Sequence, residues 1–446
     1  MIADEIPVVD TDSHLTEPSD LWLSRLPSTW RDIAPQVHYM PERGEEYWFI
    51  GGRPTHPAWT QSRARWRFPP PSHPRVFSEV DPSTYDPSAR SLALDDAGIA
   101  LQVLYPNIVA FQLQPILATR NVSFATACVQ AYNDHVGDFA HSGQGRFVAI
   151  MALPFWDLEG SLAEVDRCID RGHRGIVFAN RPEVLTTHPL TDPHWDPLWA
   201  KAQEAGLSIN FHVGFGEGFA TKPLARDRGA GSSAPEPVSF DPPPPSELPP
   251  DGSSRQLREL GEEGIADYRL GLVRIGTPMM LSNSNAFLDL ILAGVCERFP
   301  DLRFVSVESG WGYVPFMLAS ADWNWSTCGA ADSWPRRLLP SEYFRRQCFA
   351  TFWHESDTVT RTVDLYADNV MFETDFPHTV ALMPGSGREL MSARETIEEN
   401  LSGLPTSVLR KILSDNARRV YLPEAGAAGS AFRCPTAVRP SSIPES

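Results

Sequence analysis

The sequence lacks several features that would place it in a specialised class of protein. Its six cysteines stand at positions 128, 168, 296, 328, 348 and 434 without CxxC spacing, which argues against a zinc ribbon and a secreted disulfide framework. No stretch approaches the roughly 18 consecutive apolar residues of a transmembrane helix, and the N-terminus offers neither a basic leader nor an apolar signal core. We therefore expect a cytoplasmic chain with reduced structural thiols and no membrane partner.

Positive charge is also scarce. The chain has 38 Lys and Arg residues and 56 Asp and Glu residues, which gives a net charge of −18. It has no run of basic residues, so we do not expect it to bind nucleic acid. A carboxylate ligand then has to be recognised by local arginines or by a metal ion. Arg63, Arg65 and Arg67 alternate within a Trp-rich segment, and one of them is a candidate for this role, although a solvated surface position is commoner for any one arginine.

Hydrophobic material, by contrast, is plentiful, because 42% of the 446 residues are hydrophobic and 23 are Phe and 13 Trp. Short apolar runs alternate with helical patterns, and this rhythm is typical of repeated β-α units with parallel strands. The pattern predicts an α/β fold, a single (β/α)8 TIM barrel over residues 1–423. Its eight expected strands are Ile6–Asp12, Leu101–Tyr105, Phe147–Leu153, Gly175–Phe178, Leu207–His212, Arg303–Glu308, Cys348–Thr351 and Val370–Glu373.

Two segments are too long for ordinary connections, and we interpret them as insertions over the C-terminal face of the barrel. The first, at about 21–85, is rich in Trp, Pro and Arg and is expected to cover the barrel mouth. The second, at about 214–276, contains the run Pro242 to Pro245 and suits a long functional loop or lid. The tail at 424–446 has low complexity and is excluded from the expected fold.

Polar residues at the ends of three expected strands form a candidate metal site. Asp12 and His14 end the first strand, and because strand side chains alternate they point to the same side. His212 ends the fifth strand and Asp375 follows the eighth, at the face where barrel enzymes carry their active sites. Each residue alone can be explained without a metal, for example as a buried histidine or a turn cap. Four N and O ligands together favour a metal site.

These segments resemble the amidohydrolase-related family of the amidohydrolase superfamily, which includes aminocarboxymuconate semialdehyde decarboxylase and several aromatic-acid decarboxylases. The resemblance rests on Asp12-Ser-His14-Leu-Thr-Glu17, His212-Val-Gly214 and Glu373-Thr-Asp375-Phe-Pro-His378, and it runs from about residue 6 to 422. It implies one divalent ion per chain held by Asp12, His14, His212 and Asp375. Zn2+ fits the two histidines best, and the two carboxylates leave Mn2+ as an alternative.

The resemblance fails at the sixth strand, where the decarboxylases carry an acid-base histidine and this chain has Glu308. Glu308 is a candidate for proton relay, for a supporting acceptor beside a ligand, and for direct ligation. His378 is a candidate for reaching the substrate, and Asp375 for accepting a proton, whereas Glu17 is expected to support a neighbour. Trp311 and Phe376 are candidates for lining an apolar pocket, although core packing is the commoner role.

The leading hypothesis is therefore a metal-dependent carboxy-lyase that acts on a small cyclic or aromatic carboxylic acid, with Glu308 or His378 handling the proton. The alternative is a metal-dependent hydrolase of an amide, lactone or ester, in which Asp375 accepts a proton from water. A further alternative is a non-catalytic barrel that binds a ligand. The expected partner is a small carboxylate or carbonyl compound, and a homo-oligomer is left open.

Overall fold

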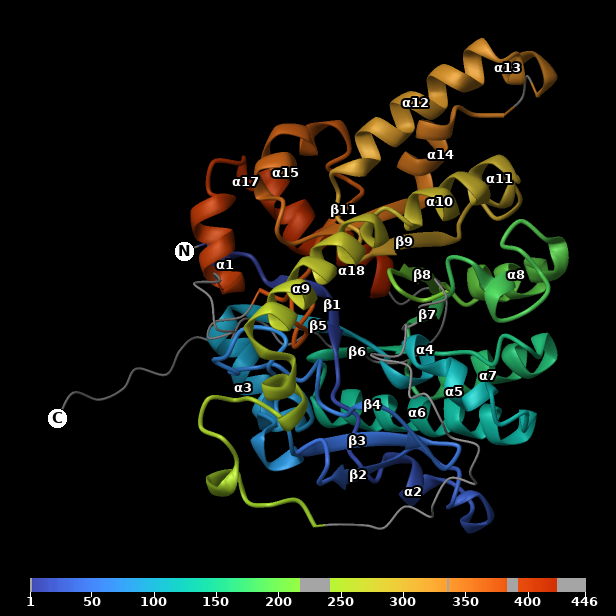
Figure 1. Ribbon diagram of the computed structural model, residues 1–446. Coiled ribbons are helices and arrows are strands. Elements are labelled where there is room, and N and C mark those ends of the chain that lie inside the picture. The colour runs from blue at the N-terminus through green and yellow to red at the C-terminus, as the bar shows by residue number, and fades with distance from the viewer. Residues whose placement is uncertain (1, 217–240, 335–336, 383–391, 423–446) are drawn as a thin grey trace.

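Eight parallel strands form the centre of the structure, a computed structural model that describes residues 2–216, 241–334, 337–382 and 392–422 (Figure 1). Their order in the sheet follows their order in the chain, with helices between them, so the expected TIM barrel is confirmed. All eight predicted strands are present, with ends shifted by a few residues at most. They are β1 Val8–His14, β5 Ile99–Tyr105, β6 Phe147–Met151, β7 Gly175–Phe178, β8 Ser208–His212, β9 Arg303–Val307, β10 Cys348–Phe352 and β11 Val370–Phe372.

The barrel closes between β1 and β11 near its C-terminal mouth. In the described part of the chain these two strands share no regular ladder, and a single parallel bridge joins Ser13 to Phe376. Hydrogen bonds from Asp375 N to Asp12 O and from His14 N to Phe376 O add to this bridge, at 3.0 and 2.7 Å. The last closing contacts of the barrel are thus made by the segments that carry three of the predicted metal ligands.

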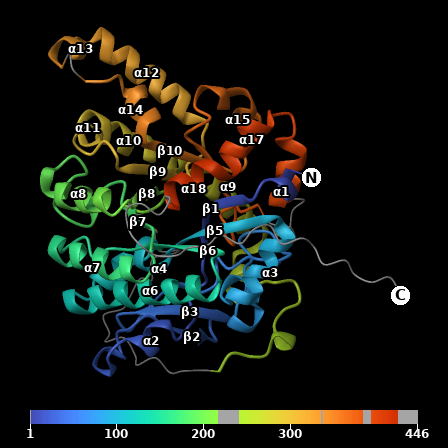
Figure 2. The same cartoon turned by 180° about the vertical axis from the view of Figure 1, so that it is seen from behind.

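Helices surround the barrel, and the view from behind shows α6, α7 and α8 stacked along one side (Figure 2). Side-chain caps fix several of their starts, since Asp86, Asn121 and Asp157 accept hydrogen bonds from the backbone at the beginning of α3, α6 and α7. The main helices are α3 Pro87–Ala97, α6 Val122–Ser142, α7 Leu158–Asp170, α8 Asp196–Glu204, α10 Asn283–Leu292, α11 Val295–Arg298, α14 Pro340–Gln347, α15 Ser356–Thr362, α17 Thr406–Arg410 and α18 Asn416–Tyr421.

The first insertion contains a small antiparallel sheet that the sequence reading did not anticipate. The sheet lies at the end of the molecule opposite the helices α12, Tyr313–Thr327, and α13, Ala330–Ser333, in both views (Figures 1 and 2). Its central strand is rich in aromatic residues and buries Trp48, Phe49 and Ile50. The strands are β2 Gln36–Met40, β3 Glu45–Ile50 and β4 Arg53–Pro57, in the order β2-β3-β4.

The second insertion differs from the expected loop, because α9 spans Arg255–Met280. This helix has a non-helical residue at Gly261, and Leu257 is its one buried residue. Residues 217–240 of the insertion lie outside the described residues, so the expected lid stays a prediction for that part. The segment before the helix is tied to the first insertion, since Arg75 donates to the carbonyl oxygens of Pro249 and Ser253.

An arm projects from the barrel on the side of β9. It consists of α12, Tyr313–Thr327, and α13, Ala330–Ser333, at its tip (Figure 1). Among the described helices, none is both long enough and apolar enough to cross a membrane. The predicted C-terminal tail at 424–446 lies outside the described residues.

Candidate metal centre and its cavity

Three strands deliver four polar side chains to one point at the barrel mouth. Asp12 and His14 come from β1, His212 from the end of β8, and Asp375 from the turn after β11, and all four side chains are buried. Ligand atoms of Asp12, His14 and His212 lie within 4.8 Å of one another, as do those of His14, Asp375 and His378. The structure therefore brings the four predicted ligands together and adds His378 to them.

His14 and His212 face each other across the mouth, with their Nε2 atoms 3.1 Å apart. Nδ1 of His212 lies 2.8 Å from the carbonyl oxygen of Val213, and because a carbonyl only accepts, Nδ1 carries the proton and Nε2 carries a lone pair. A lone pair so close to a second imidazole nitrogen calls for a proton or a cation beside the two rings. The two histidines are thus arranged to share one ion.

Asp12 and Asp375 approach these rings from the two sides of the barrel seam. The oxygens of Asp12 lie 3.5 Å from His14 Nε2 and 3.4 Å from His212 Nε2, and Asp375 Oδ1 lies 3.6 Å from His14 Nε2. All four carboxylate oxygens are buried without a hydrogen-bond partner in the described part of the chain. Since buried charge without compensation is strongly unfavourable, these residues fit a bound cation.

The electrostatics of the cluster lead to the same conclusion. Burial, followed by the charges of Glu308 and Asp12, raises the pKa of Asp375 well above its ordinary value. Burial alone lowers the pKa of His212, but the charges of Asp12 and Glu308 outweigh it and raise that pKa to about 9. Both shifts indicate a shortage of positive charge, which a divalent ion relieves more fully than a proton does.

Glu308 follows β9 directly, and its side chain is only 11% exposed. One of its oxygens lies 3.6 Å from His212 Nδ1, and Glu308, Asp12 and Asp375 offer oxygens within 4.8 Å of one another. Glu308 therefore lies close enough to the cluster for ligation and for proton relay. The structure leaves both roles open, together with that of a supporting acceptor.

His378 stacks on His14 with ring centroids 3.9 Å apart, and its Nδ1 lies 2.9 Å from Asp375 Oδ1. Its Nε2 lies 3.0 Å from Asn107 Oδ1, while the amide nitrogen of Asn107 donates to Leu15 O and so fixes the amide orientation. Nε2 then carries the proton of a neutral ring, and Nδ1 presents a lone pair to Asp375. Because Nδ1 of His378 and Oδ1 of Asp375 both present lone pairs, a proton or a cation is needed near them. A proton held there is one that His378 can exchange.

A cavity of about 710 Å³ opens beside this cluster. His212, Glu308 and His378 line it at the metal end, and its lining includes aromatic side chains from the first insertion and from the segments after β5 and β8. The first insertion thus contributes to the lining of this cavity, although its role as a cover of the mouth stays a prediction. The aromatic residues of the wall are Trp48, Trp59, Phe111 and Phe215.

A family profile described as Amidohydrolase matches residues 10–422 of the sequence, which is most of the chain. The chain belongs to the amidohydrolase family. Its sequence is 22% identical over 335 residues to 2-amino-3-carboxymuconate-6-semialdehyde decarboxylase of Dictyostelium discoideum, covering 74% of this chain and 77% of that protein.

Solved structures with the same fold include an amidohydrolase from Mycobacterium avium subsp. paratuberculosis, with a TM-score of 0.63 and 20% identity over 93% of this chain and 99% of that one. Another is a dihydroxybenzoic acid decarboxylase from Polaromonas, which was solved with bound manganese and the inhibitor 2-nitroresorcinol. Its TM-score is 0.54 at 15% identity, and the match covers 93% of this chain and 97% of that one.

Two further residues of this amidohydrolase have supporting roles. Glu17 accepts hydrogen bonds from the backbone of Asn107 and Ile108, so it holds the segment that contacts His378, as expected. Asn416 donates to the carbonyl oxygens of Ala367 and Val370, a packing contact between the last helix and the barrel.

The aromatic residues expected in the pocket lie elsewhere. Trp311 is fully buried and donates to Thr362 Oγ1. Phe376 lies under the Arg90 guanidinium. Neither residue lines the cavity, and Trp311 has the role of core packing that is the commoner alternative.

The three arginines proposed for carboxylate binding have other contacts. Arg63 is buried and donates to Phe68 O and Ser72 O. Arg65 pairs with Asp81, and Arg67 lies over the Phe68 ring. None of the three lines the cavity, so in the described part of the chain they do not fill the proposed role.

Asp10 and Glu373 are functional candidates that the sequence reading missed. Asp10 is fully buried and accepts from Thr374 N at 2.8 Å, Thr374 Oγ1 at 2.6 Å and Gln102 Nε2 at 2.7 Å. It thereby holds the residue next to Asp375. Glu373 is also buried, and burial followed by the charge of Asp12 raises its pKa well above the ordinary value. The one available signal was an acidic residue inside an apolar strand, where charge is rarely buried without a partner.

Proposed function

We propose that this amidohydrolase is a metal-dependent carboxy-lyase of a small aromatic carboxylic acid. The observation that carries the proposal is the buried cluster of Asp12, His14, His212 and Asp375 at one end of a cavity with aromatic walls. Decarboxylases of related chemistry among the similar proteins support it. A planar ring suits the aromatic wall, because aromatic side chains pack well against such rings.

Asp12, His14, His212 and Asp375 would hold one divalent ion, for which Zn2+ and Mn2+ are the candidates. When bound, such an ion supplies Lewis acidity that stabilises negative charge on substrate oxygen atoms. The two imidazoles favour Zn2+, whereas manganese is the metal in the Polaromonas decarboxylase. Elemental analysis of the purified protein identifies the metal, and close to one ion per chain is the expected content.

The protein has to deliver one proton in this reaction. The bond between the ring carbon and the carboxyl group breaks, carbon dioxide leaves, and the same carbon accepts a proton. His378 and Glu308 both line the cavity, and we assign the proton delivery to this pair of candidates. Asp375, 2.9 Å from His378 Nδ1, is positioned to retain or return a proton on that ring.

The replacement of the histidine expected at the end of the sixth barrel strand by Glu308 keeps hydrolysis as the second candidate function. A carboxylate next to a metal cluster also serves the hydrolysis of an amide, lactone or ester, with Asp375 accepting a proton from water. A non-catalytic ligand-binding barrel is the third candidate. The same cluster serves all three, so the reaction has to be tested directly.

The test is a comparison of carbon dioxide release with ester and lactone hydrolysis, using protein loaded with Zn2+ or Mn2+. Hydroxybenzoates are the first substrates to try. Release of carbon dioxide in the wild type, and its loss in His212→Ala, is the expected result. Hydrolysis without carbon dioxide release would move the assignment to the hydrolase, and neither reaction in metal-loaded protein would favour the binding barrel.

We also propose that the chain assembles with a second copy of itself through the α12–α13 arm. Phe316 and Trp323 of α12 are 79% and 70% exposed, and Trp334 beyond α13 is 51% exposed. Each large aromatic side chain has roughly 150–250 Å² of surface, and exposed apolar surface of this extent is typical of interaction sites when several such side chains lie on one face.

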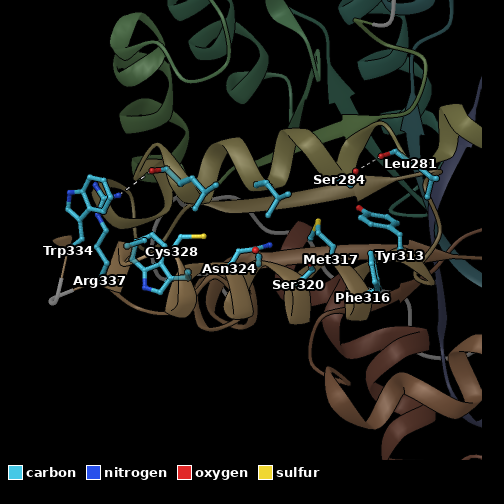
Figure 3. Close-up of a pocket in the computed structure, with 15 residues that line it drawn as sticks. Leu281, Ser284, Tyr313, Phe316, Met317, Ser320, Asn324, Cys328, Trp334 and Arg337 are labelled. Carbon is cyan, nitrogen blue, oxygen red and sulfur yellow. Dashed lines mark hydrogen bonds between the residues drawn. The ribbon is translucent and has the colours of Figure 1, made fainter. Parts of the chain in front are cut away.

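A hollow of about 680 Å³ lies between α10 and α12, and Phe316 and Trp334 are among the residues that line it (Figure 3). It is lined mainly by apolar residues, among them Leu288, Leu292 and Met317. One surface thus offers both projecting side chains and a hollow to receive them. That combination suits a two-fold interface, in which each copy presents the same patch to the other.

A further inference from the structure

His56 lies on β4 of the small sheet and lines the same cavity as His212, Glu308 and His378. It is paired across the hairpin with Trp48, which also lines the cavity. Among the described residues, His56 is not part of any group whose atoms gather to hold an ion. Its ring therefore faces a part of the cavity that the metal cluster does not occupy.

The neighbouring threonine fixes the tautomer of this ring. Thr55 Oγ1 lies 3.0 Å from the carbonyl oxygen of Trp48 and 3.0 Å from His56 Nδ1. A carbonyl oxygen only accepts, so the single hydroxyl proton of Thr55 is donated to Trp48. Thr55 Oγ1 can then only accept from His56, which places the proton of the neutral ring on Nδ1 and a lone pair on Nε2.

Within the described parts of the chain, the side-chain hydrogen bond of His56 is the one at Nδ1, and the ring borders the cavity. Burial lowers the pKa of His56 to about 4, so the ring is neutral at neutral pH. A neutral imidazole whose other nitrogen is already engaged is a directed hydrogen-bond acceptor. It offers a specific contact to any ligand group that carries a proton.

We propose that His56 is a specificity-determining residue that accepts a hydrogen bond at Nε2 from a hydroxyl or N–H group on the substrate, at a position remote from the carboxylate. This inference rests on the proposed function, and it narrows the substrate class to hydroxylated or amino-substituted aromatic acids. Methyl ethers of the same acids have the same ring but no proton to donate. They should therefore bind less tightly, since a site built to pair with a donor disfavours an analogue without one.

The experiment compares hydroxybenzoates with the matching methoxybenzoates at each ring position, by calorimetric titration of the metal-loaded protein. We expect at least one hydroxybenzoate to bind about 5- to 10-fold more tightly than its methyl ether, the range of a single hydrogen bond. His56→Phe keeps a ring of similar shape and removes the acceptor. This variant should bring the ratio close to one while the metal content stays unchanged.

Thr55→Val supplies a test that leaves the histidine in place. The valine cannot accept from Nδ1, so the proton is free to move to Nε2, and the preference for the hydroxyl compound should fall. His38→Phe is the matched control, because His38 lies in the same small sheet but does not line the cavity. It should keep the wild-type ratio, which separates the hydrogen bond from a general disturbance of the sheet.

The outcomes for the two proposals are distinguishable. A hydroxyl preference that persists in both His56→Phe and Thr55→Val would overturn the role of His56, and so would a wild type that binds both members of every pair equally. Carbon dioxide release is measured in parallel on the same acids. A preference that depends on His56 without any carbon dioxide release would refute the carboxy-lyase alone, and binding of no benzoate would refute both.

Discussion

Glu308 and Asp375 both adopt left-handed backbone conformations, with φ of 54° and 57°. Such conformations cost a non-glycine residue roughly 1–3 kcal/mol each, and they persist where the surrounding structure enforces them. Here each one bends the chain immediately after a barrel strand. The bend turns a carboxylate toward the cluster at the mouth. Favourable contacts elsewhere in the fold therefore have to offset the conformational cost of the site geometry.

The first prediction concerns the two histidines. His14→Ala and His212→Ala should each lose the ion and the activity while keeping most of the secondary structure, because each change removes one of two facing imidazoles. Elemental analysis and circular dichroism provide the two readings. His188→Ala is the matched control, since His188 is a partly exposed histidine that stacks on His194 away from the cluster. Full metal occupancy in both ligand variants would contradict the assignment.

The second prediction separates the roles of Glu308. Glu308→Gln keeps the size of the side chain and removes its titration. If Glu308 relays the proton, kcat should fall by roughly 10²-fold or more with the metal retained. If Glu308 is a ligand, the metal should be lost, and if it only supports His212, both effects should be modest. Wild-type kcat with the metal in place would leave His378 as the proton donor.

The convergence of the four proposed metal ligands could be predicted because the chemistry of each side chain and its place at a strand end are both visible in the sequence. Asp10 and Asn107 could not be assigned roles in this way. Asp10 acts through Thr374, 364 residues away in the chain, and Asn107 acts through His378, 271 residues away. Contacts of this kind follow from the closed barrel, and no local pattern encodes them.

At the scale of elements, the contacts between β1 and the turn after β11 include a pair of hydrogen bonds that supports the metal site. Thr374 donates to Asp10 through both its backbone and its hydroxyl, and Thr374 precedes Asp375. Residues that orient metal ligands through hydrogen bonds typically change metal affinity by roughly 10- to 100-fold when they are replaced. Thr374 is therefore a positioning residue for Asp375.

The third prediction follows from this contact. Thr374→Val should weaken metal binding by roughly 10- to 100-fold without unfolding the barrel, as measured by competition with a chelator. Thr374→Ser keeps the hydroxyl and is the matched control. Equal metal affinity in the valine variant and the wild type would show that the backbone contact to Asp10 suffices.

The barrel strands could be predicted because a buried parallel strand leaves a short apolar run. Helix α9 could not be predicted, because its sequence contains residues that disfavour a helix locally, namely Gly261, Gly264, Gly271, Gly276 and Pro278. Contacts with distant parts of the chain hold the helix, such as the hydrogen bond from Arg269 to the Pro70 carbonyl oxygen. The small sheet could not be predicted either, because its segment is rich in Trp and Pro residues and has no clear strand pattern. Strand β3 gains its stability from burial against the core.

At the scale of the whole molecule, we expect metal binding and barrel closure to be coupled. The seam between β1 and β11 is held by few backbone contacts, and Asp12, His14 and Asp375 flank it. An ion that binds the folded state adds to its stability, by about 2.7 kcal/mol when its free concentration is 100 times its Kd. A bound ion would therefore stabilise the closed barrel in addition to taking part in the reaction.

The fourth prediction is that removing the metal with a chelator lowers Tm by several degrees, and that adding Zn2+ or Mn2+ restores it. Differential scanning calorimetry of the full chain measures both steps. His212→Ala is the control, because its Tm should already be low and should not respond to the chelator. An unchanged wild-type Tm after complete metal removal would show that the ion and the seam are independent.

The fifth prediction tests the proposed two-fold interface of the α12–α13 arm. Phe316→Asp and Trp323→Asp each place a charge on an exposed apolar side chain, and burying an unpaired charge in an interface is strongly unfavourable. Light scattering coupled to size-exclusion chromatography should show a dimer or higher assembly for the wild type and a monomer for both variants.

Leu92→Asp is the matched control for this test, because Leu92 is 68% exposed on α3, away from the arm. It should keep the assembly of the wild type. A monomeric wild type, or variants that assemble as the wild type does, would exclude the arm as the contact between copies. If the two arm variants become monomeric and keep their metal, the interface serves assembly alone. If they become monomeric and also lose their metal, a second copy stabilises the β9 side of the site.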